Sequence, residues 1–155
     1  MKSTFKVLWI IALVAVIGFS FAACSGDDSN VDPALNGSWA NSGRVWIFNN
    51  GNWEFRIYGN PNSKGTYTTS SDNIKMIITH LPGSLLPNSL GANKGNYYTK
   101  AEIKALYEAK GEYNDIAAQW LDESFAPETY RYYVSDGGLI WIWSSEQREN
   151  FFKQP

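Results

Sequence analysis

Few residues of the chain belong to the types that carry out covalent or metal chemistry. His80 is the only histidine and Cys24 the only cysteine among 155 residues, so a zinc site would lack its usual ligands. A Ser-His-acid triad would depend on His80. The sequence has no G-x-S-x-G elbow and no phosphate-binding glycine spacing. A lone histidine at a predicted strand end is more often structural than catalytic.

Acidic residues give little support for catalysis. Asp115, Asp122 and Glu123 fall on a predicted helix, and we interpret them as a solvated face instead of a calcium site. The sequence leaves open a carboxylate pair for glycoside hydrolysis, although Glu54 alternates onto the outer face of its predicted strand. We therefore expect a protein that is not an enzyme and that needs no metal or cofactor.

The N-terminus is typical of an exported protein. Lys2 and Lys6 precede an almost wholly apolar run, 7–21, and small residues lead to Cys24. This pattern predicts a signal peptide over 1–23. An uncleaved membrane anchor is the alternative, and no charged flank follows the apolar run to support it.

The stretch Phe21-Ala22-Ala23-Cys24 resembles the lipobox of bacterial lipoproteins, although Phe21 stands where leucine is usual. The resemblance implies that Cys24 is acylated, for example with palmitate, and becomes the mature N-terminus on a membrane. Ser25, by analogy with lipoprotein sorting, favours the outer over the inner membrane of the cell envelope. Residues 24–34 are polar and acidic and predict a flexible tether. An incidental buried cysteine is the alternative for Cys24.

The charge of the chain argues against nucleic acid as a partner. Removing 1–23 takes away two of the 13 lysines and arginines, which leaves 11 against 15 acidic residues and a net charge of about −4. No basic cluster is present.

The clearest turn signal is Asn50-Gly51, which fits a type I′ hairpin between two aromatic-rich runs, 44–48 and 53–57. A two-residue turn there pairs Phe48 with Trp53, Trp46 with Phe55 and Arg44 with Ile57. Side chains alternate along a strand, so the aromatic residues share one face, which we expect to be buried. Arg44 lies at the end of that face, where it could line a mouth.

Two further hairpins are predicted. A turn on Ser71-Asp72 pairs Tyr67 with Met76 and Thr69 with Ile74. A turn on Asp136-Gly137 pairs Val134 with Leu139, Tyr132 with Trp141 and Tyr130 with Trp143. In that register Ile140 and Ile142 point outward and need cover.

Between them lies an insertion, 81–126. A leucine-rich loop is followed by the capping box Thr99-x-x-Glu102, which predicts a helix over 100–110, and a second helix is expected over 114–122. We expect the insertion to pack on the outside of the sheet over Ile140 and Ile142. A lid or an open face for a protein partner is the alternative.

These patterns predict a mainly β domain over 35–155, an eight-stranded antiparallel up-and-down barrel with a helical insertion before the last three strands. The expected strands are 37–41, 44–49, 52–58, 64–70, 73–80, 128–134, 138–144 and 148–153. A β-sandwich is the main rival.

Gly37-Ser38-Trp39 at the head of this meander resembles the lipocalin and wider calycin signature. The run Lys64-Gly65-Thr66-Tyr67 is similar to that in lipocalin-like domains of bacterial lipoproteins, such as those of spirochaetes. The resemblance covers most of 35–80 and, weakly, 129–153. It implies that Trp39 closes one barrel end and that Arg148 packs over it.

The aromatic interior is the candidate ligand site. Its residues are Arg44, Trp46, Trp53, Phe55, Tyr67, Tyr130, Tyr132, Trp141 and Trp143. An eight-stranded barrel is just wide enough for its own side chains or for one small ligand. The sequence thus leaves three possibilities: a filled core, a pocket for a small apolar ligand, and a protein-binding module that acts through 81–126.

Overall fold

The computed structural model describes residues 30–135, 139–143 and 148–155, and for 139–143 and 148 it describes the backbone alone. The strands are β1 (Gly37–Asn41), β2 (Arg44–Asn49), β3 (Asn52–Ile57), β4 (Asn60–Ser70), β5 (Asn73–Pro82), β6 (Tyr97–Tyr98), β7 (Glu128–Val134), β8 (Leu139–Trp143) and β9 (Arg148–Lys153). The α-helices are α2 (Lys100–Ala109) and α3 (Asp115–Ser124), and short 3₁₀ helices are η1 (Pro33–Leu35), η2 (Gly83–Leu85) and η3 (Asn88–Leu90).

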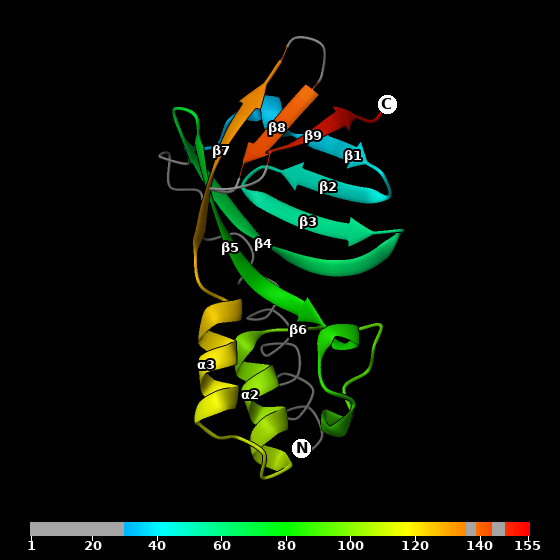
Figure 1. Ribbon diagram of the computed structural model, residues 1–155, viewed down its shortest axis with the longest axis vertical. Coiled ribbons are helices and arrows are strands. Elements are labelled where there is room, and N and C mark those ends of the chain that lie inside the picture. The colour runs from blue at the N-terminus through cyan, green and yellow to red at the C-terminus, as the bar shows by residue number, and fades with distance from the viewer. Residues whose placement is uncertain (1–29, 136–138, 144–147) are drawn as a thin grey trace, which may run out of the picture.

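The strands form one curved antiparallel sheet with a barrel-like shape (Figure 1). Their order is β4-β3-β2-β1-β9-β8-β7-β5, and a further pairing joins β4 to β5, so each of these eight strands has two neighbours. The contact between β1 and β9 is the narrowest, because it rests on Trp39 beside Lys153 and Ala40 beside Phe152. All eight predicted strands are present, and only the two-residue β6, which pairs with the end of β5, was not predicted.

Two predicted hairpins are confirmed. Asn50 and Gly51 both have positive φ, 44° and 83°, as a type I′ turn requires. The resulting register pairs Phe48 with Trp53, Trp46 with Phe55 and Arg44 with Ile57. The β4–β5 hairpin likewise pairs Tyr67 with Met76 and Thr69 with Ile74.

The predicted β7–β8 register is wrong by one residue. Val134 pairs with Ile140 instead of Leu139, Tyr132 with Ile142, Tyr133 with Trp141 and Arg131 with Trp143. A one-residue change exchanges the two faces of a strand. Ile142 therefore pairs with the inner-face residue Tyr132 and Ile140 with Val134, whereas Trp141 pairs with Tyr133, which is 59% exposed. The predicted Asp136-Gly137 turn lies outside the described residues.

The hydrophobic core of the sheet is buried most fully toward the end that carries η1. Its buried residues are Leu35, Trp39, Phe48, Trp53, Tyr67, Ile74, Met76, Tyr132 and Phe151. Trp39 is fully buried and donates its indole N–H to the carbonyl of Leu35 at 2.7 Å. The predicted partner of Trp39 needs correction: the ammonium of Lys153 lies 5.3 Å from the ring centre, whereas Arg148 lies at the other end of β9, paired with Trp143. The side chain of Arg148 is not among those described.

The segment before β1 is anchored to this end of the sheet. Asn30 accepts hydrogen bonds from the backbone N–H and the hydroxyl of Thr69, and Asp32 accepts one from the Tyr132 hydroxyl at 2.9 Å. Val31 packs against the core. The flexible tether predicted for 24–34 therefore needs correction at 30–34, because these residues find partners on β4 and β7; residues 24–29 lie outside the described part.

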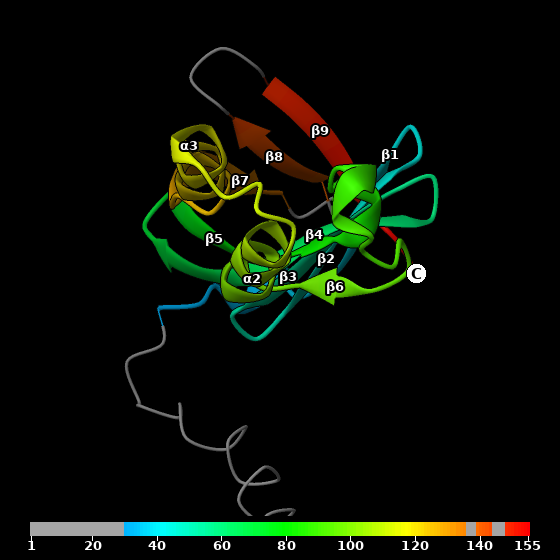
Figure 2. The same cartoon turned by 90° about the horizontal axis from the view of Figure 1, so that it is seen from below.

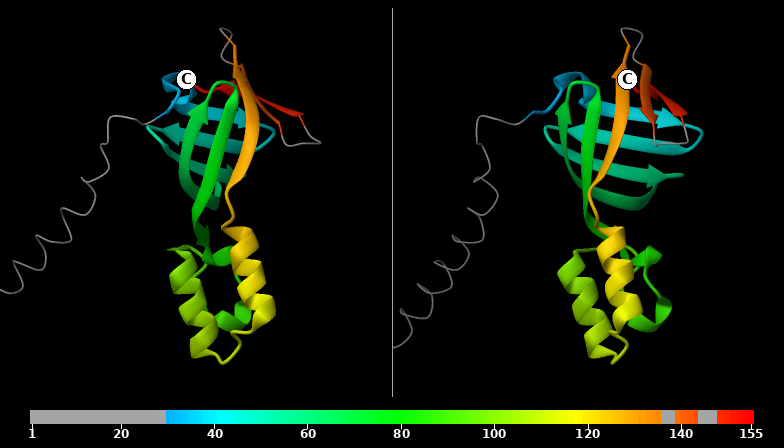
Figure 3. Two further views of the ribbon diagram at one scale, coloured as in Figure 1. Left: turned by 90° about the vertical axis from the view of Figure 1, so that its left-hand side faces the viewer. Right: turned by 60° about the vertical axis from the view of Figure 1, so that its left-hand side comes forward.

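The insertion forms a second hydrophobic core below the sheet (Figures 1 and 3). Its buried residues are Leu81, Leu86, Leu90, Ile103 and Leu121. This corrects the prediction that α2 covers Ile140 and Ile142, since the apolar face of α2 packs on α3 and on the leucines of 81–90. In Figure 2, seen from below, α2 and α3 are viewed nearly end-on in front of the sheet. The half-buried Ile78 contacts both cores.

The helix ends follow the predicted caps. Thr99 and Glu102 form the reciprocal capping box, and Gly111 has φ 68° just beyond α2. α3 begins after Asn114, whose side chain accepts from the N–H of Ala117 at 3.0 Å.

Candidate functional site

Burial of the inner face of the sheet decreases toward the insertion. Along β5, Ile74 is fully buried, Met76 is 4% exposed and Ile78 is half-buried. Along β7, Tyr132 is buried, Tyr130 is half-buried and Glu128 is exposed. One end of the interior is thus filled with side chains, while the end nearer the insertion is not.

A pocket of about 190 Å³ lies at this less-filled end. It is lined by Trp46, Trp53, Phe55, Ser63, Met76, Ile78, Ala126, Glu128 and Tyr130. The lining is mostly apolar, and it is contributed by β2, β3, β4, β5, β7 and the residues just after α3.

The aromatic wall of the pocket is built by the first hairpin. The rings of Trp46 and Phe55, paired across β2 and β3, stack with centroids 4.3 Å apart and an angle of 23°. Trp53 tilts against Trp46 at 5.3 Å, and its indole donates to the Thr66 carbonyl at 3.0 Å. Gly65 pairs with Trp53, and a Cβ there would come within 3.0 Å of the indole and 1.8 Å of the Ile77 carbonyl oxygen. The glycine of the predicted Lys64–Tyr67 run therefore makes room for this wall.

Polar groups occur on the opposite side. The hydroxyl of Tyr130 donates a hydrogen bond to the carboxylate of Glu128, two residues earlier on the same face of β7. Ser63 is buried in the wall and donates to Asn62 at 3.3 Å. Among the lining residues that the structure describes, Glu128 alone carries a formal charge.

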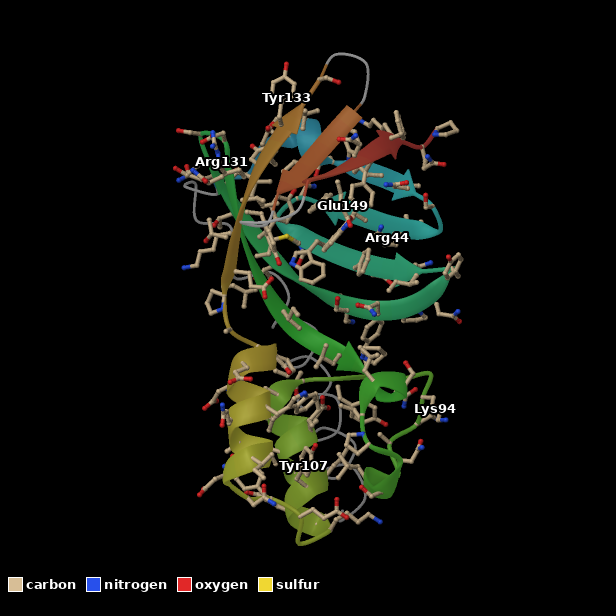
Figure 4. All side chains as sticks on the ribbon, viewed as in Figure 1. Arg44, Lys94, Tyr107, Arg131, Tyr133 and Glu149 are labelled. Atoms are coloured by element: carbon tan, nitrogen blue, oxygen red, sulfur yellow. The ribbon has the colours of Figure 1, made fainter. Side chains whose placement is uncertain are left out.

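An ion pair lies beyond Trp46 on the same face. Arg44 of β2 donates to Glu149 of β9 at 2.5 Å, although β1 separates these strands (Figure 4). The ion pair therefore links β2 to β9 across the strand between them, β1. Arg44 does lie near the end of the aromatic face, as predicted, but its charge is matched by Glu149 and it does not line the pocket.

The predicted interior residues divide into three groups. Trp46, Trp53, Phe55 and Tyr130 line the pocket. Tyr67 and Tyr132 belong to the packed end. The side chains of Trp141 and Trp143 lie outside the described residues, and their backbone register is the corrected one above.

The two tyrosines of the packed end are held in their neutral form. Burial, followed by the hydrogen bond to Asp32, raises the pKa of Tyr132 to about 12. Burial also raises the pKa of Tyr67, whose hydroxyl finds no hydrogen-bond partner among the described residues. These groups fit a structural role at the filled end.

Five lining residues were not predicted. Met76, Ile78 and Glu128 follow the same alternation as Ile74 and Tyr130, so strand periodicity could have found them. Ser63 lies on the same buried face of β4 as Tyr67, but it was missed because the predicted strand began one residue later, at 64. Ala126 follows α3, and only the three-dimensional position of the helix brings it to the pocket.

Among the described residues, the lining of the pocket contains no histidine or cysteine that could carry out covalent or metal chemistry. No group of three or more His, Cys, Asp and Glu within the described ranges is arranged to hold a metal ion. His80 contacts the Thr79 hydroxyl at 2.9 Å, and its pKa is lowered, first by burial and then by Lys64. The pocket instead offers a flat aromatic surface, aliphatic side chains and one carboxylate.

A second concave surface lies on the insertion. This groove has a volume of about 940 Å³ and is more open to solvent than the pocket in the sheet. It runs between the 84–88 segment and the helices α2 and α3. Its lining includes Tyr107 and Lys94, which are labelled in Figure 4. Ile116 and Leu85 are 80% and 49% exposed along it. Exposed aliphatic side chains of this kind occur at protein-binding surfaces.

Contacts on the outer face fix the insertion to the sheet. Tyr97 of β6 donates to Glu54 of β3 at 3.1 Å, and the ammonium of Lys64 lies 4.5 Å from the Tyr97 ring centre. Burial and the Glu54 carboxylate raise the pKa of Tyr97 to about 12. Glu54 is on the outer face, as predicted, and is bonded to Arg56 at 2.9 Å.

Comparisons with known proteins add little. The sequence matches no protein-family model and no curated protein. Among solved structures, it is similar to a lipocalin-like protein from Bacteroides uniformis ATCC 8492, with 12% identity and a TM-score of 0.43; the match covers 78% of this chain and 99% of that chain. No helix in the described part of the chain is both long and apolar enough to cross a membrane.

Proposed function

We propose that this chain is a lipid-anchored lipoprotein of the bacterial cell envelope whose lipocalin-like barrel binds a small apolar ligand without catalysis. The observation that carries the binding function is the pocket of about 190 Å³ with its aromatic wall. It lies at one end of an interior that is otherwise filled by its own side chains.

The size of the pocket limits the ligand. Apolar cavities of about 150 Å³ hold a benzene-sized molecule, whereas drug-sized ligands need about 300 Å³ or more. A pocket of about 190 Å³ suits a single ring with a short substituent. The stacked Trp46 and Phe55 offer such a ring a parallel surface.

Native mass spectrometry of the soluble domain, residues 30–155, tests for a co-purified small molecule. Calorimetric titration with neopentylbenzene, a neutral ring with a compact alkyl group, tests the pocket directly. Ala126→Trp places a large side chain at an exposed lining position and should abolish binding without disturbing the core. Ala101→Trp, at an exposed position of α2 remote from the lining, is the matched control. Equal binding by both variants would reject the pocket as the site.

The anchor rests on the lipobox-like stretch before Cys24. Cys24→Ala should leave the precursor unprocessed and should prevent incorporation of labelled palmitate, while Ser25→Ala should be labelled normally. Fractionation of outer and inner membranes tests the location. Undiminished labelling of Cys24→Ala would reject the assignment.

The alternative is a protein-binding module, and the open groove on the insertion favours it. Ile116 is 80% exposed there, so Ile116→Asp should change the free energy of unfolding by no more than about 0.5 kcal/mol. Under this alternative that variant loses partner binding while Ala126→Trp retains it. Under the proposed function, Ile116→Asp retains binding of the small ligand and Ala126→Trp loses it.

A further inference from the structure

The charged group that lines the pocket restricts the class of ligand that it can bind. This inference rests on the proposed small-ligand function. Among the described residues, the lining contains one carboxylate, Glu128, and no lysine or arginine. The nearest inner-face cation named above, Arg44, is bonded to Glu149 at 2.5 Å. An anionic ligand such as a fatty-acid carboxylate would therefore meet a like charge at Glu128 without a compensating partner.

The aromatic residues favour the same sign of charge. The faces of Trp, Phe and Tyr rings carry negative electrostatic potential and attract organic cations, most strongly where water is excluded. Four aromatic residues line the pocket: Trp46, Trp53, Phe55 and Tyr130. The wall and the carboxylate thus select together for a positive group beside an apolar body.

The position of the carboxylate agrees with this selection. Glu128 is exposed, so its charge remains hydrated and costs little free energy when the pocket is empty. The hydrogen bond from the Tyr130 hydroxyl holds the carboxylate on the inner-face side of β7. A ligand that places a ring on Trp46 and Phe55 can present an ammonium group toward β7. Burial of that group beside the carboxylate would strengthen their attraction relative to water.

We propose that the pocket binds small organic cations: an aromatic or alkyl body against Trp46 and Phe55, with an ammonium group beside Glu128. Benzyltrimethylammonium is a suitable probe, because neopentylbenzene has nearly the same shape without the charge. We expect calorimetry at low ionic strength to give at least tenfold tighter binding for the cation. The preference should weaken as salt is raised.

Glu128→Gln tests the role of the carboxylate with little change in shape. It should weaken binding of the cation about tenfold and leave binding of neopentylbenzene unchanged. Glu123→Gln removes the same charge from an exposed position on α3 and should change neither titration. Ala126→Trp should block both compounds.

The outcomes separate the two proposals. Equal affinity for the two compounds, or a preference for the cation that survives in Glu128→Gln, overturns the cation proposal and leaves the apolar-ligand function standing. If neither compound binds to the wild-type domain, both proposals fall.

Discussion

The two hydrophobic cores of this chain are built from different side chains. The sheet core is aromatic: Trp39, Phe48, Trp53, Tyr67, Tyr132 and Phe151 are all buried in it. The buried residues of the insertion core are aliphatic: Leu81, Leu86, Leu90, Ile103 and Leu121. The pocket of about 190 Å³ is lined by three of the ring systems of the first hairpin, Trp46, Trp53 and Phe55. The aromatic core is therefore the one that borders the pocket.

The cores also differ in how far apart their residues lie in the sequence. The sheet core joins residues from Leu35 to Phe151, while the buried residues of the insertion core all fall between Leu81 and Leu121. Local contacts can open and close without the rest of the chain. We therefore expect the insertion to unfold locally, and the sheet to unfold only as a whole.

The largest effect is expected at Trp39. Trp39→Ala removes a fully buried indole and its hydrogen bond to Leu35, and it should lower the free energy of unfolding by about 3–5 kcal/mol. Phe152→Ala, at a 59% exposed position of β9, is the control and should be nearly neutral. Urea denaturation followed by circular dichroism measures both. Similar denaturation midpoints for the two variants would show that the packed end of the sheet contributes little to the free energy of unfolding.

The next effect separates the two regions. Leu121→Ala removes a buried side chain from the insertion core, with a cost of about 2–4 kcal/mol. Hydrogen exchange should become faster in α2 and α3 and remain unchanged in β2 and β3. Equal acceleration in the sheet would contradict local unfolding and would mean that the two cores form one cooperative unit.

A pH effect is expected from Tyr132. A pKa of about 12, against about 10 in an unfolded chain, means that the folded state holds this proton more tightly. The contribution is complete below pH 10 and should disappear as pH rises to 12, at a cost of about 2–3 kcal/mol. Tyr132→Phe should reduce the loss of stability in this window, and Tyr58→Phe, at a 79% exposed position, should not. The same alkaline loss in all three proteins would assign it to other groups.

The smallest effect is expected for the ion pair between the two helices. Lys100 and Asp122 are 2.6 Å apart, but both side chains are largely exposed. Lys100→Ala should cost at most about 1 kcal/mol, and less at high salt. A larger cost, measured by exchange in α2 and α3, would mean that charge contributes as much as leucine packing to the insertion.

Local rules predicted much of the sheet. Asn50-Gly51 determined a register because both turn residues need positive φ, and Thr99 with Glu102 marked the start of α2 for an equally local reason. The β7–β8 register was missed because it depends on how many residues the connection uses, which Asp136-Gly137 alone does not determine. Because of this one-residue error, the predicted partner of Tyr132 was Trp141 instead of Ile142.

The site was predictable only in part. Trp46, Trp53, Phe55 and Tyr130 followed from alternation, but the sequence could not say which aromatic residues meet one another and which leave space. It also could not place the insertion: the apolar face of α2 requires a partner surface without specifying whether this is the sheet or its own neighbouring leucines.

β5 and β7, the strands at which the chain leaves and re-enters the sheet, lie side by side, with Met76 directly opposite Glu128. Beyond Met76, β5 continues along β4 as far as His80, so the part of the chain that only connects β5 to β7 begins after His80. Exchanging residues 81–126 would leave the pairing of the eight strands unchanged but would replace Ala126, which borders the pocket. The insertion is thus a modular element through which ligand preference could diversify while the scaffold stays the same.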